Sequence, residues 1–160
     1  MIVVSDTSTI CYLLLIDRID ILSILYQTIT IPQAVADELT ASESPPIVQS
    51  WIDRPPNWLN IEAPETTQDH GLETLDLGER EAILLSEQLR AELVILDDKA
   101  ARKIARERGL NIIGLLGIIK DAASRGLLDL EITFQQLQNA GFWVSPSLLD
   151  SLLRNGEIER

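Results

Sequence analysis

Residues 92–109, "ELVILDDKAARKIARERG", decide the fold because they combine a strand, an acidic pair and a basic helix. The apolar run LVIL (93–96) is typical of a buried strand. The segment from Lys99 to Arg108 favours a helix and is rich in cations. Asp97 and Asp98 fall between the two elements. The stretch therefore predicts a strand that ends in carboxylates and leads directly into a helix.

The same alternation of strand and helix extends along the rest of the chain. Further strands are expected over IVVS (2–5), TITIP (28–32), LNIEA (59–63) and NII (111–113). Helices are expected as two short segments on either side of DRID (17–20), from Pro32 through QAVADEL (33–39), over 47–53, over 77–90, and near 115–125, 133–140 and 146–154. This order predicts an α/β fold with a parallel sheet covered on both faces.

The composition indicates one folded domain. The chain has 160 residues, of which 46% are hydrophobic and 24% are charged, which suits a single core without disulfide or metal staples. Its one cysteine, Cys11, lies in the apolar run ICYLLLI (10–16) and is expected to be buried. A disulfide framework and a multi-cysteine zinc site are thereby excluded.

Charge and hydropathy bear on the partners and the compartment. A net charge of −12 disfavours broad adhesion to nucleic acid or anionic lipid. A polyanion partner would need a local device, either bound divalent cations or one basic strip. The longest apolar run near the start is far shorter than the about 20 residues that span a bilayer. We expect no signal peptide, no membrane helix and a cytoplasmic location.

Acidic residues follow the predicted strands. In a parallel sheet, ligands bind at the carboxyl ends of the strands, where the strand order switches. Carboxylates gathered there repel one another unless a hard cation neutralises them, and Mg²⁺ or Mn²⁺ prefers oxygen ligands. Such a metal can activate a water molecule and stabilise a leaving oxygen. The candidate catalytic and metal-binding residues are Asp6, Glu38, Glu79, Glu81, Asp97 and Asp98.

Each acid also has a purely structural interpretation. Asp6 could simply cap the helix that follows it, and an isolated Asp or Glu is usually a solvated charge. Glu79 and Glu81 lie two positions apart on one helix and point in different directions, so the pattern does not decide which one faces a metal. Asp97 and Asp98 pose the same question, because one could coordinate while the other caps the next helix.

Other catalytic machinery is sparse in the sequence. His70 is the only histidine and lies in a loop expected over 64–76, so it is interpreted as an ordinary surface residue. A Ser-His-Asp or Cys-His site therefore has one poorly placed base. No Gly-rich phosphate loop of either common type is present. These absences favour chemistry that needs carboxylates and metal alone.

The basic segment after the acid pair suggests a contact with phosphates. Lys99, Arg102, Lys103 and Arg106 fall at helical spacing and form a band along one side of the helix. We expect this band to guide the phosphates of a ligand toward the carboxylates. The alternative is a solvated face that offsets an acidic domain.

Four segments, in order, carry a resemblance to a known family. They are VVSDTST (3–9), ITIPQAVADEL (29–39), the long stretch from LDLGEREA to LLGII (75–119), and GFWVSPSLLDSLL (141–153). Together they resemble a PIN-type metal-dependent ribonuclease domain, and more closely the PIN-like family first catalogued as a domain of unknown function. The resemblance implies a three-layer α/β/α sandwich over residues 1–160, with a helical extension at about 127–160. It also implies an acidic pocket that binds one or two Mg²⁺ or Mn²⁺ ions and hydrolyses RNA phosphodiesters.

The family's acids carry over by position. Asp6 matches the first-strand aspartate, Glu38 the glutamate after the second strand, and Asp97 or Asp98 the fourth acid. The third acid is commonly an aspartate in PIN domains, and here the resemblance implies Glu79 or Glu81. PIN domains also often have Ser or Thr two residues before the final aspartate, where this chain has Ile95 or Leu96.

Three functions are compatible with these observations. The leading hypothesis is a metal-dependent endoribonuclease of the toxin type, with RNA as substrate and with a small antitoxin protein or a second copy of the chain as partner. The second is a PIN-like module that no longer cleaves and acts by binding RNA or a protein, and loss of activity on chelation separates the two. A phospho-accepting signalling domain would need its acid pair after the first strand and a lysine at a late strand end, whereas NIIGLLG (111–117) has none.

Overall fold

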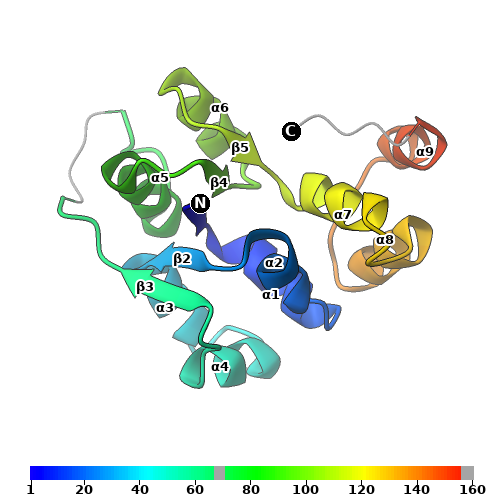
Figure 1. The fold of residues 1–160 in the computed structure, drawn as a ribbon, viewed down its shortest axis with the longest axis horizontal. Helices are drawn as coiled ribbons and strands as arrows, with labels where there is room; N and C mark the ends of the chain where they lie inside the picture. Colours follow the sequence, from blue (N-terminus) through cyan, green and yellow to red (C-terminus); the bar gives the residue numbers. More distant parts are fainter. Residues whose placement is uncertain (67–70, 156–160) are drawn as a thin grey trace.

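A parallel sheet forms the centre of the molecule (Figure 1). The computed structural model describes residues 1–66 and 71–155 of the chain. The strands of the sheet are β1 (Val3–Ser5), β2 (Ile29–Pro32), β3 (Leu59–Glu62), β4 (Leu93–Ile95) and β5 (Ile112–Ile113), in the spatial order β3-β2-β1-β4-β5. The chain runs outward from β1 to β2 and β3 on one side, and to β4 and β5 on the other. The order therefore switches at β1 and β4, where a ligand site is expected.

The short strands contribute side chains to two hydrophobic cores, because successive side chains point to opposite faces of the sheet. Val3 of β1 and Ile95 of β4 belong to the larger hydrophobic cluster. Their neighbours Val4 and Val94 belong to the smaller one on the opposite face. The parallel pairing of Val3 with Leu93 and Ser5 with Ile95 keeps the carboxyl ends of β1 and β4 level.

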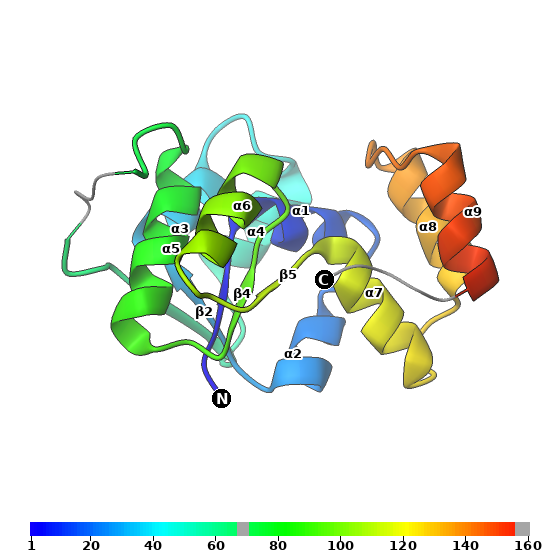
Figure 2. The same ribbon diagram turned by 90° about the horizontal axis from the view of Figure 1, so that it is seen from above.

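Helices cover both faces, and Figure 2 shows them from a second side. Helices α5 (Leu77–Leu89) and α6 (Lys99–Glu107) enclose the smaller cluster. The larger cluster receives apolar side chains from the other helices that border it: α1 (Thr7–Leu15), α2 (Asp20–Tyr26), α3 (Gln33–Thr40), α4 (Pro46–Asp53), α7 (Leu115–Ser124), α8 (Leu130–Asn139) and α9 (Pro146–Asn155). The predicted parallel α/β sandwich is thus confirmed.

Some predicted boundaries were wrong for local reasons. Helix α8 begins three residues earlier than expected, because the Asp129 side chain caps it by accepting a hydrogen bond from Ile132 N (2.9 Å). Strand β4 ends at Ile95 and not at Leu96, so the two aspartates that follow are outside the sheet. His70 and part of the expected 64–76 loop lie outside the described residues. No helix in the described part of the chain combines the length and apolarity needed to cross a membrane.

Candidate active site

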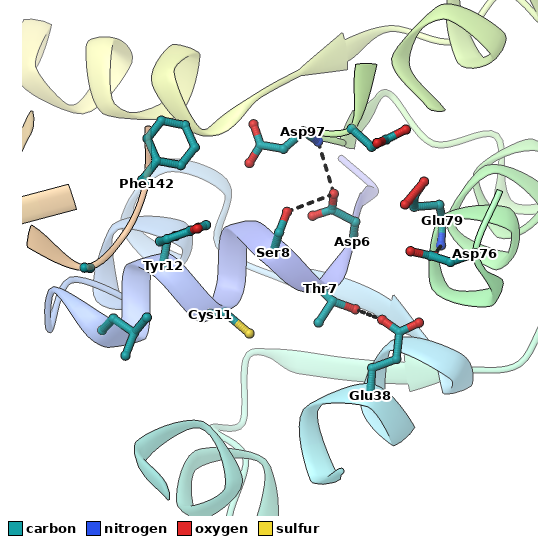
Figure 3. Close-up of a pocket in the computed structure, with 13 residues that line it drawn as sticks. Asp6, Thr7, Ser8, Cys11, Tyr12, Glu38, Asp76, Glu79, Asp97 and Phe142 are labelled. Atoms are coloured by element: carbon teal, nitrogen blue, oxygen red, sulfur yellow. Dashed lines mark hydrogen bonds between the residues drawn. The ribbon is translucent and has the colours of Figure 1, made fainter. Parts of the chain in front are cut away.

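A cavity of about 670 Å³ opens at the carboxyl edge of the sheet, where the strand order switches. Figure 3 shows side chains from α1, α3, the start of α5 and the segment after β4 meeting around it. Six carboxylates line the cavity: Asp6, Glu38, Asp76, Glu79, Asp97 and Asp98. The remaining lining side chains are hydroxyl-bearing, apolar or aromatic ones from α1 and from the end of α8.

Asp6 is the most deeply placed of these acids, with 3% of its surface exposed. It caps α1, and its Oδ2 accepts a hydrogen bond from Asp97 N (3.1 Å). Its own backbone N–H donates to Ile95 O (3.0 Å), which anchors the end of β1 to β4. Burial, and secondly the charge of Asp97, raise the pKa of Asp6 from 3.8 to about 7. A carboxylate with this pKa has an unfavourable charge that a cation would stabilise.

Two separate helices hold the side chain of Asp97 beside Asp6. Its Oδ1 accepts from Leu115 N at the start of α7 (2.9 Å), and its Oδ2 accepts from Thr9 Oγ1 of α1 (2.9 Å). Burial raises the pKa of Asp97, while these hydrogen bonds and Arg102 act against the rise. The two strand-end aspartates therefore converge as the topology predicted.

Glu38 reaches the cavity from α3 and is fixed on both oxygens. Its Oε2 accepts from the Thr7 hydroxyl, and its Oε1 accepts from Gly78 N (3.0 Å). A Cβ at position 78 would lie 2.5 Å from Glu38 Oε1, so any other residue there would displace the Glu38 carboxylate from this position. Burial raises the pKa of Glu38 above its ordinary value.

Glu79 projects from the first turn of α5 toward the other acids (Figure 3). The pKa of Glu79 is raised to about 8. Burial is the largest cause, and the hydrogen bond to Asp76 and the charges of Asp76, Asp98 and Asp6 raise it further. A proton shared in this group, or a bound cation, relieves that repulsion.

The structure separates the two glutamates of α5 that the sequence left undecided. Glu81 is buried but does not line the cavity. Its Oε1 instead accepts from Ala34 N (3.1 Å) in the first turn of α3, a helix whose N-cap residue, Pro32, has no hydrogen-bond acceptor in its side chain. Glu81 thus satisfies a backbone donor that the helix start would leave unpaired.

Asp76 is the acid that the sequence reasoning missed. It follows no strand, so the rule that ligands bind at the ends of strands did not predict it. Its Oδ1 accepts from Glu79 N (2.9 Å) and caps α5. The available signal was the pattern D-L-G-E, an aspartate three residues before a glutamate at the start of a clearly amphipathic helix.

Cys11 is not fully buried, contrary to expectation. It is partly exposed on α1 and lines the cavity. Burial, and secondly the charges of Asp6 and Glu38, raise the pKa of its thiol to about 11. The thiol therefore stays protonated at neutral pH, and thiolate chemistry is disfavoured.

The four predicted phosphate contacts do not form one uniform face. Lys99, Lys103 and Arg106 are exposed on α6. Arg102 turns back toward the sheet, and its Nη1 donates to Leu96 O (2.8 Å). It lines a second cavity of about 330 Å³ that also includes Asp97 and Phe142. Arg102 is therefore placed near the acids, while the other three face solvent.

The donor set suits a hard divalent cation, although the side chains are not arranged around one. Among the described residues, no three Asp, Glu, His or Cys side chains form a group that could hold a metal ion together. Each of Asp6, Glu38 and Asp97 rests instead against N–H or O–H donors. The raised pKa values of four acids show that negative charge is destabilised here. Oxygen ligands under mutual repulsion fit Mg²⁺ or Mn²⁺ in chemistry.

A comparison with protein families decides the classification. A family model described as DUF3368, PIN domain, matches residues 2–157. The chain belongs to this PIN-domain family. PIN domains are generally nucleases and typically use divalent metal ions. Searches among curated proteins and among solved structures each returned no match.

Proposed function

We propose that this PIN domain is a Mg²⁺- or Mn²⁺-dependent endoribonuclease that hydrolyses RNA phosphodiester bonds. The observation that carries the proposal is the convergence of six carboxylates from separate elements on one cavity at the switch point of the sheet. A phosphodiester is itself an anion, so these acids repel it unless a cation is bound between them. A metal nuclease uses such a cluster directly, whereas a protein that only binds RNA has no use for it.

Within this proposal, the metal would be held by Asp6, Glu38, Glu79, Asp97 and Asp98, which line the cavity. When bound, a divalent ion lowers the pKa of a coordinated water and stabilises the charge that develops on the leaving oxygen. The chain keeps its acids in place through the hydroxyls of Thr7 and Thr9 and through backbone N–H groups. These contacts orient the carboxylates before any ligand arrives, and such supporting contacts sustain metal affinity.

The proposal extends to a toxin-like role, with a small antitoxin protein as partner. Its support is the length and layout of the chain, which resemble bacterial PIN toxins. The alternative, a PIN module that binds but does not cleave, predicts no metal-dependent turnover at all.

Two neighbouring residues of α3 provide a matched test. Glu38 lines the cavity, whereas Asp37 is exposed and accepts from Gln33 Nε2 (2.9 Å) outside it. With Mn²⁺ and single-stranded RNA, Glu38→Gln should lose activity by more than the about 10- to 100-fold that outer supporting residues cause. Asp37→Asn should cleave normally, and EDTA should stop the unmodified protein. Equal activity of Glu38→Gln and the unmodified protein, or cleavage that survives EDTA, would overturn the proposal.

A further inference from the structure

The cavity has an apolar wall that phosphate hydrolysis by itself does not require. Tyr12 and Leu15 of α1 and Ala140 and Phe142 at the end of α8 line it together with the acids. In Figure 3, the Tyr12 and Phe142 rings lie at the opposite end from Glu79. Once a cation is bound among the acids, a ligand that fills the whole cavity must therefore carry an anionic part and a flat or apolar part side by side.

Local backbone geometry fixes the position of Phe142. Helix α8 ends in a paired turn, in which Phe142 N donates to Leu137 O (2.9 Å) and Gly141 N donates to Gln138 O (3.0 Å). Gly141 has φ +99°, a conformation that glycine adopts at little cost. The residue after this glycine is thereby directed back toward the core and the cavity.

A second contact holds the ring from the side of α1. The Tyr12 and Phe142 rings meet edge to face, with centroids 5.1 Å apart and planes at 78°. Both residues are only partly buried, so part of their surface stays open to the cavity. Phe142 also lines the second cavity, which contains Arg102. The ring therefore borders both cavities, as Asp97 also does.

We propose that Tyr12 and Phe142 form a subsite that binds a nucleobase next to the phosphate that the metal-loaded carboxylates receive. This inference rests on the proposed function, because that function supplies the RNA. Every base has a face that stacks on an aromatic ring, whereas bases in a duplex are already stacked and paired. The rigid placement of Phe142 reduces the entropy lost when a base is held there.

The neighbour of Phe142 offers a matched control. Trp143 is a larger aromatic residue with 78% of its surface exposed, and it does not line the cavity. Any general effect of aromatic side chains on RNA binding should be stronger at Trp143. A site-specific effect should be confined to Phe142.

The test measures binding and cleavage separately. The probes are a fluorescent oligoadenylate of ten nucleotides and an abasic chain of equal length. Binding is measured with Ca²⁺ and cleavage with Mn²⁺. Phe142→Ala should weaken binding of the oligoadenylate by about 5- to 150-fold, the range for loss of one base stack. Binding of the abasic chain should not change. Trp143→Ala should behave as the unmodified protein, and Phe142→Tyr should retain binding.

The outcomes separate the two proposals. Phe142→Leu keeps apolar bulk without an aromatic ring, and it replaces the alanine variant if a thermal melt shows that the latter is unfolded. If the folded variant without an aromatic ring, Phe142→Ala or Phe142→Leu, binds and cleaves oligoadenylate like the unmodified protein, the base site is refuted and the nuclease stands. If the unmodified protein cleaves nothing with Mn²⁺ but loses affinity when Phe142 is changed, the nuclease is refuted and the base site stands.

Discussion

Replacing Asp6 by Asn should stabilise the metal-free protein above neutral pH and not at acidic pH. The pKa of Asp6 is 3.8 in its unperturbed form and about 7 in the folded protein. Between these values the unfolded chain releases a proton that the folded protein retains, so stability falls as pH rises and stays low above pH 7. Since one pKa unit corresponds to about 1.4 kcal/mol, the ionised carboxylate costs the fold on the order of 4 kcal/mol.

Asparagine removes this charge but loses one acceptor. Asp6 accepts from Asp97 N (3.1 Å) and more weakly from Thr9 N (3.5 Å), and the single amide oxygen can serve only one of them well. This loss costs about 1 kcal/mol. The net gain at pH 8 is then about 3 kcal/mol, or roughly 6–12 °C in Tm for a chain of this size. Near pH 4 the variant should be slightly less stable than the unmodified protein.

The assay is a pair of thermal melts in EDTA at pH 4.5 and pH 8, with Asp37→Asn as an exposed control from outside the cavity. Mn²⁺ at 100 times its Kd should then stabilise the unmodified protein by about 2.7 kcal/mol. The difference in Tm between Asp6→Asn and the unmodified protein should become smaller as a result. RNA cleavage by Asp6→Asn should be absent. A Tm difference between Asp6→Asn and the unmodified protein that is the same at both pH values would refute the electrostatic reasoning.

Two further predictions separate structural from functional residues. Glu81→Ala should lower the free energy of unfolding by about 1–3 kcal/mol because it unpairs a buried backbone donor, yet the variant should retain kcat. Glu79→Ala should lose RNA cleavage without any loss of stability. Thermal melts and cleavage kinetics that show the reverse would exchange the two roles. Changing Lys103 and Arg106 together to Gln should reduce the slope of log K against log salt for single-stranded RNA by about 1.4, at roughly 0.7 per phosphate. Arg125→Gln, an exposed change just after the end of α7, should leave the slope unaltered. An equal slope for all three proteins would mean that α6 is only a solvated face.

The parts of the fold that depend on local pattern could be predicted. Tertiary contacts are not needed to recognise the β-branched runs, the helical spacing or the aspartates that follow strands. Because the carboxyl ends of parallel strands share one edge of the sheet, Asp6 could be predicted to lie near Asp97. The choice between Glu79 and Glu81 could not be predicted, because it depends on how α5 packs against β1, β2 and α3. Phe142 was also beyond reach. It enters the cavity only because the turn at Gly141 and the contact of its ring with Tyr12 bring a segment that is distant in the sequence to this place.

The sequence posed helix capping and ligand binding as competing interpretations of the aspartates, and the structure removes that conflict. Asp6, Asp76 and Asp98 each cap a helix and each line the cavity. A cap uses one lone pair of one carboxylate oxygen, so acceptor capacity remains for a ligand even at Asp6, whose other oxygen accepts from Asp97 N. It also places the positive end of a helix at the cavity, and three such ends stabilise bound anions. The same geometry therefore keeps close carboxylates tolerable in the empty site and attracts a phosphate once a cation has neutralised them.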